Sequence, residues 1–442
     1  MKTLLIALAL TQATPDTLPD FSHPWSLREC TEWALEHNLS VAAQQYNAQT
    51  QEVNQNTARM AWLPGVSASV GENLNFGRGL GGNNTYEYGN TYEYGNTAST
   101  SLSLGASMTL FDGLATPARM QLAKLNLEAA TKDLEKVRED VSISVAQAYV
   151  QIIYSQQILD VAREQVAIDS LQVVRLEGML ANGRASTADV SQQRASLAQS
   201  RLTLVQATNN VRSAVLDMAQ LLELPKIEGF SVQPLANEPE AVALPSPDDI
   251  YAEAVGLRPS IQAEELRLEG TDQSVRIAKS QYYPTLTLSG GLGSNYYSSF
   301  DQGFGEQLGN NFSQYVGLSL NIPIFSRFAV RNQVKVAKIN RSQQEVQVQR
   351  AKNALYKEIV QAWNGAVAAE AKWQSAREAE SAARDAFELQ QAKYESGKST
   401  LTEFNETRSR MVKAQSDAAQ ASCEYLFQTR LVDFYRGKGL EM

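Results

Sequence analysis

Two glycine-containing motifs have residue types and spacing that suggest phosphate binding. Gly77-Arg78-Gly79-Leu80-Gly81-Gly82 fits a dinucleotide fingerprint, but it falls at the expected tip of a hairpin with no helix after it. Gly397-Lys398-Ser399 resembles the end of a phosphate-binding loop, yet position 392 is alanine rather than glycine. The only histidines are His23 and His37, and no metal spacing or nucleophile–base pair stands out. We therefore expect no enzyme, no cofactor and no metal site.

The first 13 residues have the pattern of a secretory signal peptide. Lys2 precedes the apolar run Leu4–Leu10, and a small residue, Ala13, stands before a possible cleavage point. The alternative is an ordinary apolar first helix. The run is too short to span a bilayer, which needs about 20 apolar residues, and no stretch of that length occurs elsewhere. We expect an exported protein, either soluble or inserted as a β-barrel. Its net charge of −9 disfavours nucleic acid as a partner.

The two cysteines, Cys30 and Cys423, are too few for a disulfide scaffold. Neither sits just after the signal, so the sequence does not encode a lipid-anchored N-terminal cysteine. A bridge between them is possible in an oxidising compartment, and the sequence leaves their pairing open.

The chain repeats one plan twice. Segments before the first predicted hairpin recur 220 positions later, whereas segments after it recur 214 positions later. A tandem hexapeptide, Asn84–Gly89 followed by Asn90–Gly95, accounts for the difference of six. Because added length is tolerated at the surface, we expect this duplication in a loop. The recurring pairs include Trp62-Leu63-Pro64 with Tyr282-Tyr283-Pro284, and Gly183-Arg184-Ala185-Ser186 with Gly397-Lys398-Ser399-Thr400.

Each repeat is predicted to contain a helix, a β-hairpin, a very long helix and a shorter return helix. After the signal, 1–13, the repeats cover 14–247 and 248–442. The first repeat comprises helix 26–60, β-hairpin 65–111, long helix 114–182, return helix 186–222 and a proline-rich linker, 225–247. The second comprises helix 248–280, β-hairpin 285–325, long helix 327–396, return helix 400–435 and a short tail.

The predicted strands have one apolar and one small polar face. In Ser101–Leu110 and Val316–Ile324 every second residue is apolar, and neither stretch carries a charge. This pattern fits lipid on one side and a watery lumen on the other, although a soluble sandwich sheet is an alternative. Small barrels need about eight strands, and open sheet edges are not viable in lipid. We therefore expect several copies to close one barrel.

The long helices must pack lengthwise against other helices. The spans Phe111–Gly183 and Phe325–Gly397 each cover 72 positions, without proline beyond the first turn. At 1.5 Å per residue each helix would be roughly 105 Å long. Rods of this length pack side by side, either around a tunnel or as a plain coiled coil without a lumen. The return helices are predicted to begin with capping boxes over 186–189 and 400–403.

This duplicated order and spacing resembles the TolC family of outer-membrane efflux ducts over essentially the whole mature chain. The resemblance implies a mixed α/β membrane protein, a homotrimer with a twelve-stranded transmembrane β-barrel and a twelve-helix α-helical barrel in the periplasm. It also implies docking to a periplasmic adaptor protein and an inner-membrane pump, in the envelope of a Gram-negative bacterium. The residues that carry it are Leu63-Pro64, Tyr283-Pro284, Leu110-Phe111-Asp112-Gly113, Ile322-Pro323-Ile324-Phe325-Ser326, Gly183, Gly397, and Trp25-Ser26-Leu27-Arg28-Glu29-Cys30 followed by Ala34-Leu35.

The resemblance further implies a gate at the turns Gly183 and Gly397, which would lie at the periplasmic mouth. Acidic residues on the last helix ring the constriction in the family, and the matching positions are Glu403 and Glu406. Several copies would surround one narrow opening with like charges that attract cations. Glu403 also serves as a capping residue, and the alternative for Glu406 is a solvated helix face.

The family pins its closed mouth with links between neighbouring turns. Tyr394 and Asp189 match two positions of such links, whereas the basic partner position is occupied by Ser399. The resemblance therefore does not supply that salt bridge, and Lys398 or Arg184 would be the substitutes. How the closed mouth is locked stays open at this point.

Three classes of function fit the sequence. The first is a passive outer-membrane duct for efflux or type I secretion, and the second is a structural or adhesive coiled-coil protein at the cell surface. The third is a periplasmic adaptor, which carries one helical hairpin between compact β domains. Two hairpins of charge-free amphipathic strands favour the duct. The cargo and the class of pump are not encoded in a recognisable way.

Overall fold

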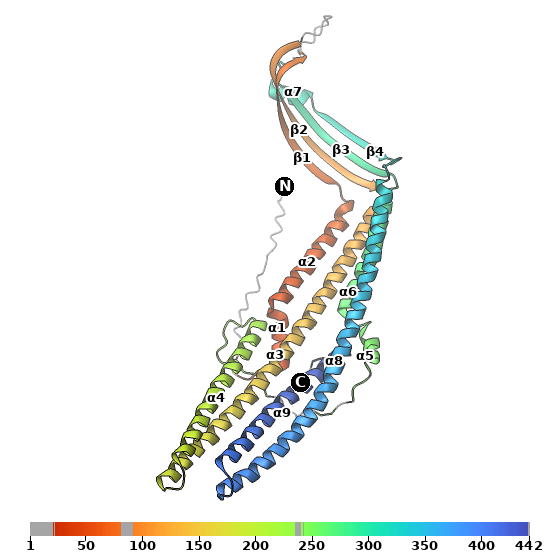
Figure 1. Ribbon diagram of the computed structural model, residues 1–442. Helices are drawn as coiled ribbons and strands as arrows, with labels where there is room; N and C mark the ends of the chain where they lie inside the picture. Colours follow the sequence, from red (N-terminus) through yellow and green to blue (C-terminus); the bar gives the residue numbers. More distant parts are fainter. Residues whose placement is uncertain (1–20, 22, 81–91, 235–239, 242, 441–442) are drawn as a thin grey trace. The chain divides into compact units, whose positions relative to one another are not determined.

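The computed structural model describes residues 21, 23–80, 92–234, 240–241 and 243–440 (Figure 1). They fall into two compact units. The helical unit comprises the described residues within Met1–Tyr46, Asp133–Ile261 and Ala351–Met442, and the sheet unit comprises those within Asn47–Lys132 and Gln262–Arg350. Each unit draws on both halves of the sequence, so the compact units are not the two repeats expected at 14–247 and 248–442. The reason is that the longest helices run through both units.

The helices have the following bounds. In chain order they are α1 (Leu27–His37), α2 (Leu39–Arg59), the short 3-10 helix η1 (Met60–Trp62), α3 (Ala115–Ala181), α4 (Thr187–Leu221), α5 (Pro247–Ala254), α6 (Pro259–Ser280), α7 (Phe304–Asn310), α8 (Ala329–Glu395) and α9 (Leu401–Tyr435). The helices α3 and α8 contain 67 residues each, which corresponds to a length of about 100 Å.

The expected helix 26–60 is divided at Asn38, which is a correction to the sequence prediction. Asn38 adopts extended backbone angles and ends α1. Its side chain then caps the next helix, because Oδ1 accepts a hydrogen bond from the Ser40 amide at 2.9 Å. Its Nδ2 donates to the Leu221 carbonyl at 2.9 Å, which ties the break to the end of α4.

The expected helix 248–280 is also divided. The helix α5 ends at Ala254, and α6 begins at Pro259. Proline disfavours helical angles at the residue before it, and it is well tolerated in the first turn of a new helix. The break therefore follows from Pro259, whose effect the sequence prediction overlooked.

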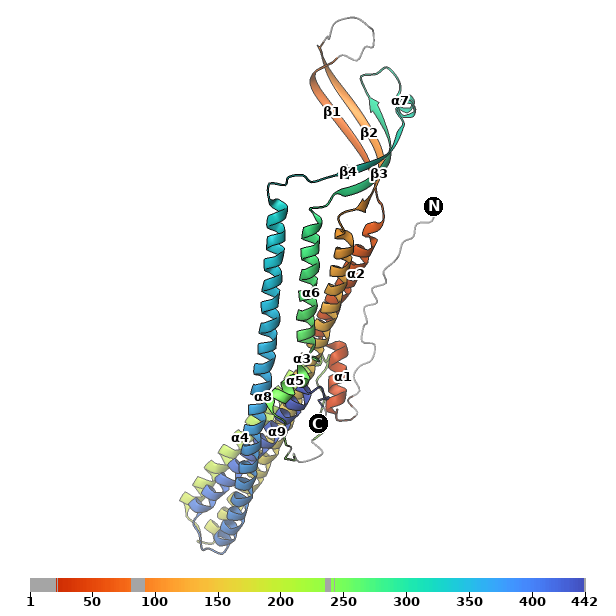
Figure 2. The ribbon, with the colours of Figure 1, turned by 90° about the vertical axis from the view of Figure 1, so that its right-hand side faces the viewer.

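The sheet unit contains one antiparallel sheet in the order β1-β2-β3-β4 (Figure 2). Its strands are β1 (Gly65–Leu80), β2 (Tyr92–Phe111), β3 (Thr285–Tyr297) and β4 (Ser313–Asn321). The second hairpin, expected over 285–325, carries the short helix α7 in its connection, and β4 ends at Asn321. In the described sheet β1 and β4 each pair on one side only, so they form its two edges.

The register places large apolar residues on one face of the sheet. Leu104 lies opposite Ala68 on β1 and Leu292 on β3. Val70 and Val316 on the same face are 75% and 84% exposed. Water-soluble monomers rarely expose apolar patches of this kind, so this face requires a partner or lipid in the working protein.

Part of the expected hexapeptide loop belongs to a strand. Residues 84–91 and the predicted signal peptide 1–13 lie outside the described residues. The remaining part of the second copy, Tyr92–Gly95, forms the start of β2 and pairs with Gly77–Leu80 of β1. The prediction that the whole duplication is loop was therefore wrong. Both strands continue beyond the stretch in which apolar residues alternate. In this extension the strands are recognised from their backbone pairing, because the sequence shows no alternating pattern there.

The turn from β2 into α3 has a requirement for glycine. Gly113 and Leu114 both have positive φ, at 67° and 69°. A Cβ atom at position 113 would lie 2.5 Å from the Ser280 carbonyl oxygen, so a larger residue has no room. The corresponding turn from β4 into α8 uses Arg327 and Phe328 at φ 50° and 62°, a region that residues with side chains rarely adopt.

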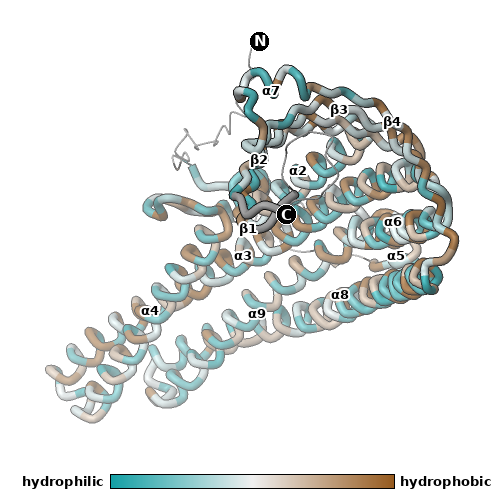
Figure 3. Tube along the Cα trace, turned by 90° about the horizontal axis from the view of Figure 1, so that it is seen from above, coloured by the Kyte–Doolittle hydropathy of each residue, from teal (hydrophilic) through white to brown (hydrophobic). Residues whose placement is uncertain are grey.

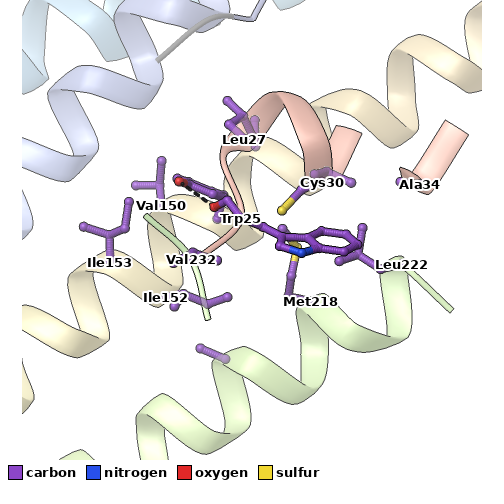
Figure 4. Close-up of a cluster of buried hydrophobic side chains, with 14 of the residues drawn as sticks. Trp25, Leu27, Cys30, Ala34, Val150, Ile152, Ile153, Met218, Leu222 and Val232 are labelled. Atoms are coloured by element: carbon purple, nitrogen blue, oxygen red, sulfur yellow. Dashed lines mark hydrogen bonds between the residues drawn. The ribbon is translucent and has the colours of Figure 1, made fainter. Parts of the chain in front are cut away.

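The largest apolar cluster of the helical unit gathers residues of α1, α3, α4 and the linker (Figure 4). Trp25 lies in it and forms a parallel bridge with Val232 of the linker. The Tyr149 hydroxyl donates to the Gln233 carbonyl at 2.9 Å and so fixes the linker on α3. The described part of the linker is therefore ordered against the helices. Trp25, Cys30, Met218 and Leu222 are among the cluster members that Figure 4 labels.

Both cysteines are buried as free thiols. Burial raises the pKa of Cys30 to about 12 and the pKa of Cys423 to about 11. The thiols therefore stay protonated at neutral pH and behave as small apolar groups in the core. The disulfide that the sequence left open is not formed.

The long helices carry hydrophobic and hydrophilic residues along their whole length. Figure 3 shows hydrophilic and hydrophobic residues interspersed along the long helices. Among the residues that the structure describes, no helix combines the length and hydropathy that crossing a membrane would need.

Candidate functional site

Two helix–turn–helix tips in the helical unit contain the predicted gate residues. The turns between α3 and α4 and between α8 and α9 are built around Gly183 and Gly397, with φ of 67° and 73°. At each tip the glycine amide donates to the carbonyl three residues back, and the next amide donates to the carbonyl five residues back, at 2.8–3.1 Å. This is the Schellman motif, in which glycine ends a helix because it tolerates the left-handed conformation. The repeat thus encodes the same stop signal twice.

Each return helix begins with a capping box. The Asp189 amide donates to Ser186 Oγ at 3.0 Å, and Asp189 Oδ2 accepts from the Ser186 amide at 3.1 Å. Thr400 and Glu403 make the same reciprocal pair at 3.3 and 3.2 Å. The hydrogen bonds from Ser186 hold the pKa of Asp189 below its usual range. Asp189 and Glu403 are therefore ionised carboxylates at the positive ends of two helices.

Ser399 acts on Glu403 by a hydrogen bond. The Ser399 hydroxyl donates to Glu403 Oε2 at 2.6 Å, and Gln390 Nε2 donates in turn to Ser399 Oγ. The Ser399 bond is the main cause, with the Thr400 amide second, that lowers the pKa of the Glu403 carboxyl. A serine at this position cannot form the expected salt bridge, but it stabilises the charged form of the neighbouring acid.

The other charged residues of the predicted gate face solvent. Glu406 is exposed and forms an ion pair with Arg410, one turn further along α9, at 2.6 Å. Arg184 and Lys398 are also exposed, and within the described single chain neither makes an ion pair. The two proposed substitutes for the missing basic partner are therefore available for contacts outside this chain but are not engaged within it.

Tyr394 connects the two tips. Its ring stacks on Phe404 with a centroid distance of 4.8 Å, and the Arg175 guanidinium of α3 lies 5.6 Å from the ring centre. Arg175 also pairs with Glu395 at 3.8 Å. Burial raises the pKa of Tyr394, Arg175 lowers it, and the negative charge of Asp189 raises it. The structure thus brings Tyr394 and Asp189 into one electrostatic environment, and it adds Arg175, which sequence reasoning missed.

A second polar cluster was also missed. We call it the Asp169 network, and it is centred on an Asp169 carboxylate that is 0% exposed. Oδ1 accepts from Gln193 Nε2 at 2.9 Å and from Arg408 Nη1, while Oδ2 accepts from Gln165 Nε2 at 3.0 Å and from Ser200 Oγ. These residues come from α3, α4 and α9. A single Asp in a long amphipathic helix gives no signal of this, because its partners lie in distant segments.

A comparison with known families decides what the chain is. The profile described as "Outer membrane efflux protein" matches residues 32–223 and 250–431, which together cover most of the chain. The chain belongs to the outer membrane efflux protein family. One matched segment lies within 14–247 and the other lies within 248–442.

Individual relatives of this efflux protein agree with that placement. It is 22% identical to outer membrane efflux protein BepC of Brucella suis over 88% of this chain and 80% of BepC. It is 23% identical to outer membrane protein TolC of Escherichia coli over 79% of this chain and 71% of TolC. Among solved structures, the outer membrane protein VceC of Vibrio cholerae matches with a TM-score of 0.74 and 18% identity, over 94% of this chain and 97% of VceC. The resemblance to the TolC family is confirmed.

The efflux protein is a channel component of the Gram-negative outer membrane, and its helical part lies in the periplasm. Its mixed fold of long helices and membrane-type β-hairpins is that of the family. The surface adhesin and the periplasmic adaptor are therefore set aside as functions. In the described residues no group of His, Cys, Asp and Glu side chains could hold a metal ion.

Proposed function

We propose that three copies of the chain form one passive export channel. The observation that carries this proposal is the four-stranded sheet, whose outer strands β1 and β4 each have an open edge and whose apolar face is exposed. Pairing β4 of one copy with β1 of the next would close twelve strands and leave no edge in lipid. The helices of the three copies would line the periplasmic tunnel in the same way.

The channel would work with two partners. A periplasmic adaptor protein would contact the helical unit, and an inner-membrane pump would load cargo through it, in a tripartite efflux or a type I secretion system. Energy would come from the pump, so the chain itself needs no catalytic site or cofactor. The outer-membrane lipid would cover the apolar face of the sheet.

The helix tips would form the periplasmic gate. Three copies would place Glu403 and Glu406 around one opening, where six carboxylates would attract cations and repel anions. The pairing of Glu406 with Arg410 weakens its contribution, and Glu403 therefore carries more of the effect. Tyr394, Asp189 and Arg175 would hold the tips together within each copy. Lys398 and Arg184 would be free to contact the neighbouring copy.

Assembly is tested by outer-membrane fractionation followed by gel electrophoresis with and without heating. We expect the protein in the outer-membrane fraction, as a trimer in mild detergent that falls to monomer when heated. Purified trimer should conduct in a planar lipid bilayer. A protein that is monomeric and soluble without detergent would contradict the proposal.

The partners are tested by cross-linking in whole cells. We expect an adaptor protein to be cross-linked to cysteines placed on the exposed tips, for example at Lys398. The identity of the inner-membrane protein that copurifies with this adaptor would tell an ATP-driven secretion pump from a drug or metal pump.

A further inference from the structure

The Asp169 network ties one helical hairpin to the other within a single chain. Asp169 belongs to α3 and its partners Gln193 and Ser200 belong to α4, so these residues form the interior of the first hairpin. Arg408 comes from α9 of the second hairpin and reaches Asp169 with its guanidinium, and both side chains are almost fully buried, at 6% and 0% exposure. Asn405, one turn before Arg408, donates to Gln193 Oε1 at 3.3 Å. Two residues of α9 therefore insert into the first hairpin.

A buried ion pair of this kind favours two states of the contact between α9 and the first hairpin, fully formed or fully separated. The desolvation of two charges offsets most of their attraction, so the pair adds little net stability compared with apolar packing. Removing one partner, however, leaves an uncompensated charge in a dry interior, which is strongly unfavourable. The helix α9 is thus either seated against α3 and α4 with the pair complete, or separated from them with both charges hydrated.

The network is also incompletely satisfied in the seated arrangement. Arg408 Nε, Asn405 Oδ1 and Gln165 Oε1 are buried and lack a hydrogen-bond partner in the described structure. Buried polar groups are normally paired, and those left unpaired cost free energy. Water would satisfy these atoms once the helices part. The arrangement is therefore suited to opening rather than to maximal stability.

In the part of the second repeat that the structure describes, no equivalent network occurs. With the offset of 214, Asp169 corresponds to Ala383 and Arg408 corresponds to Arg194. Ala383 packs against the apolar cluster of Phe387, Phe404 and Met411. Arg194 pairs instead with Glu177 at the exposed surface, at 2.6 Å. Among the described residues, the Asp169–Arg408 pair therefore has no counterpart at the repeat-equivalent positions.

We propose that the Asp169–Arg408 pair is a latch that holds α9 in the closed position and thereby positions the gate. Glu403 and Glu406 lie on the same helix within two turns of Arg408, so seating Arg408 fixes where these carboxylates stand. The latch supplies a link between hairpins inside each copy at a tip where Ser399 replaces the basic residue. Asp169 and Arg408 are positioning residues, and this inference rests on the proposed gate at the helix tips.

Single-channel recording tests the latch. Asp169→Asn and Arg408→Met keep the shapes of the side chains and leave one polar partner unpaired. Each should raise the ratio of open to closed time by about tenfold or more, because the seated state is the one that loses the ion pair. Arg194→Met, which removes the repeat-equivalent arginine with its exposed pair, should leave the ratio unchanged. Cation selectivity should remain that of wild type in Arg194→Met.

A paired substitution separates a latch from simple damage. Asp169→Asn combined with Arg408→Met removes both charges and keeps an amide oxygen as acceptor for Gln193, so no uncompensated charge is left in the interior, and it should restore the wild-type ratio of open to closed time. Equal open times in wild type and in both single variants would overturn the proposal. The proposal would also be overturned if both single variants and Arg408→Lys failed to assemble into trimers. The pair would then be needed for folding rather than for gating.

Hydrogen exchange measured on the detergent-solubilised protein gives a readout that does not need conduction. Amides in α9 near Arg408 and in α4 near Gln193 should exchange faster in Asp169→Asn than in Arg194→Met. If the wild-type protein forms no channel but this difference is present, the proposed function and the gating role fail together, and the pair only holds α9 against α3 and α4. If the channel conducts but the exchange rates and open times do not differ, the latch fails alone.

Discussion

At the residue scale, the charge that each gate carboxylate presents depends on which residues contact it. Glu403 and Glu406 are three positions apart on α9, but Glu403 accepts hydrogen bonds from Ser399 and Thr400, whereas Glu406 pairs with Arg410. The first environment preserves a negative charge, and the second compensates it. Two acids that look alike in the sequence therefore differ in their expected effect on ions.

Replacing the acids of α9 should change ion preference. We expect Glu403→Ala to lower the preference for cations measured from reversal potentials across a bilayer, and Glu403→Lys to lower it further or reverse it. The same changes at Glu406 should have smaller effects, because Arg410 already compensates its charge. Asp417→Asn, at an exposed position on the same helix, is the control. Selectivity equal to wild type in the Glu403 variants would remove the gate assignment.

Replacing Ser399 should shift the pH at which cation preference is lost. The Ser399 hydrogen bond lowers the pKa of Glu403, so the carboxylate stays charged to a lower pH than an ordinary glutamate. In Ser399→Ala this pKa rises toward its ordinary value. Cation preference should then disappear at a higher pH than in wild type, when reversal potentials are recorded between pH 3 and 6. A shift to lower pH, or none, would show that Ser399 does not tune Glu403.

At the element scale, most ends of helices and strands are determined by neighbouring residues in the sequence. Tertiary contacts determine the others. The capping boxes, the two tip glycines and Pro259 all act through neighbouring backbone groups. The break at Asn38 differs, because Asn38 donates to the end of α4, far away in sequence. The extension of β2 to Tyr92 likewise depends on pairing with β1.

Deleting one hexapeptide should leave assembly intact. The two copies, Asn84–Gly89 and Asn90–Gly95, are identical, so removal of either gives the same sequence. The remaining copy can take the place of Tyr92–Gly95 opposite Gly77–Leu80 in the hairpin. We expect the heat-sensitive trimer to form in wild-type amounts on gels. A variant that accumulates as monomer would show that the extra six residues contribute to assembly.

At the scale of the whole molecule, one chain provides an incomplete structure. The sheet has two open edges, and residues such as Val316 and Leu318 are largely exposed on its apolar face. Apolar surface of this extent is stable only when lipid or another copy covers it. The incomplete sheet is a feature of a component that functions in an assembly.

The two faces of β4 should respond differently to charge. Val316→Lys places a cation on the apolar face, where it would cost about 2–4 kcal/mol at the middle of a bilayer. We expect less trimer in the outer membrane. Ser319→Lys, three residues along on the opposite face, should leave the amount of trimer close to wild type because that face would line the watery lumen. Equal losses for both variants would argue against lipid on the apolar face.

The sequence by itself determined the repeat, the alternating strands, the long helices and the family. These features are local or periodic, so they can be recognised without knowing which segments meet. The same holds for the capping roles of Asp189 and Glu403, which depend on a residue three positions away.

Only the tertiary structure decided how the chain divides into units, why Asn38 interrupts a helix, and where Arg175, Asp169 and Arg408 act. Arg408 and Asp169 are 239 positions apart, and each alone resembles an ordinary charged residue on an amphipathic helix. Their role arises because folding removes both from water at the same point. The free energy of a charge depends on its surroundings, and those surroundings are set by which distant helices pack together.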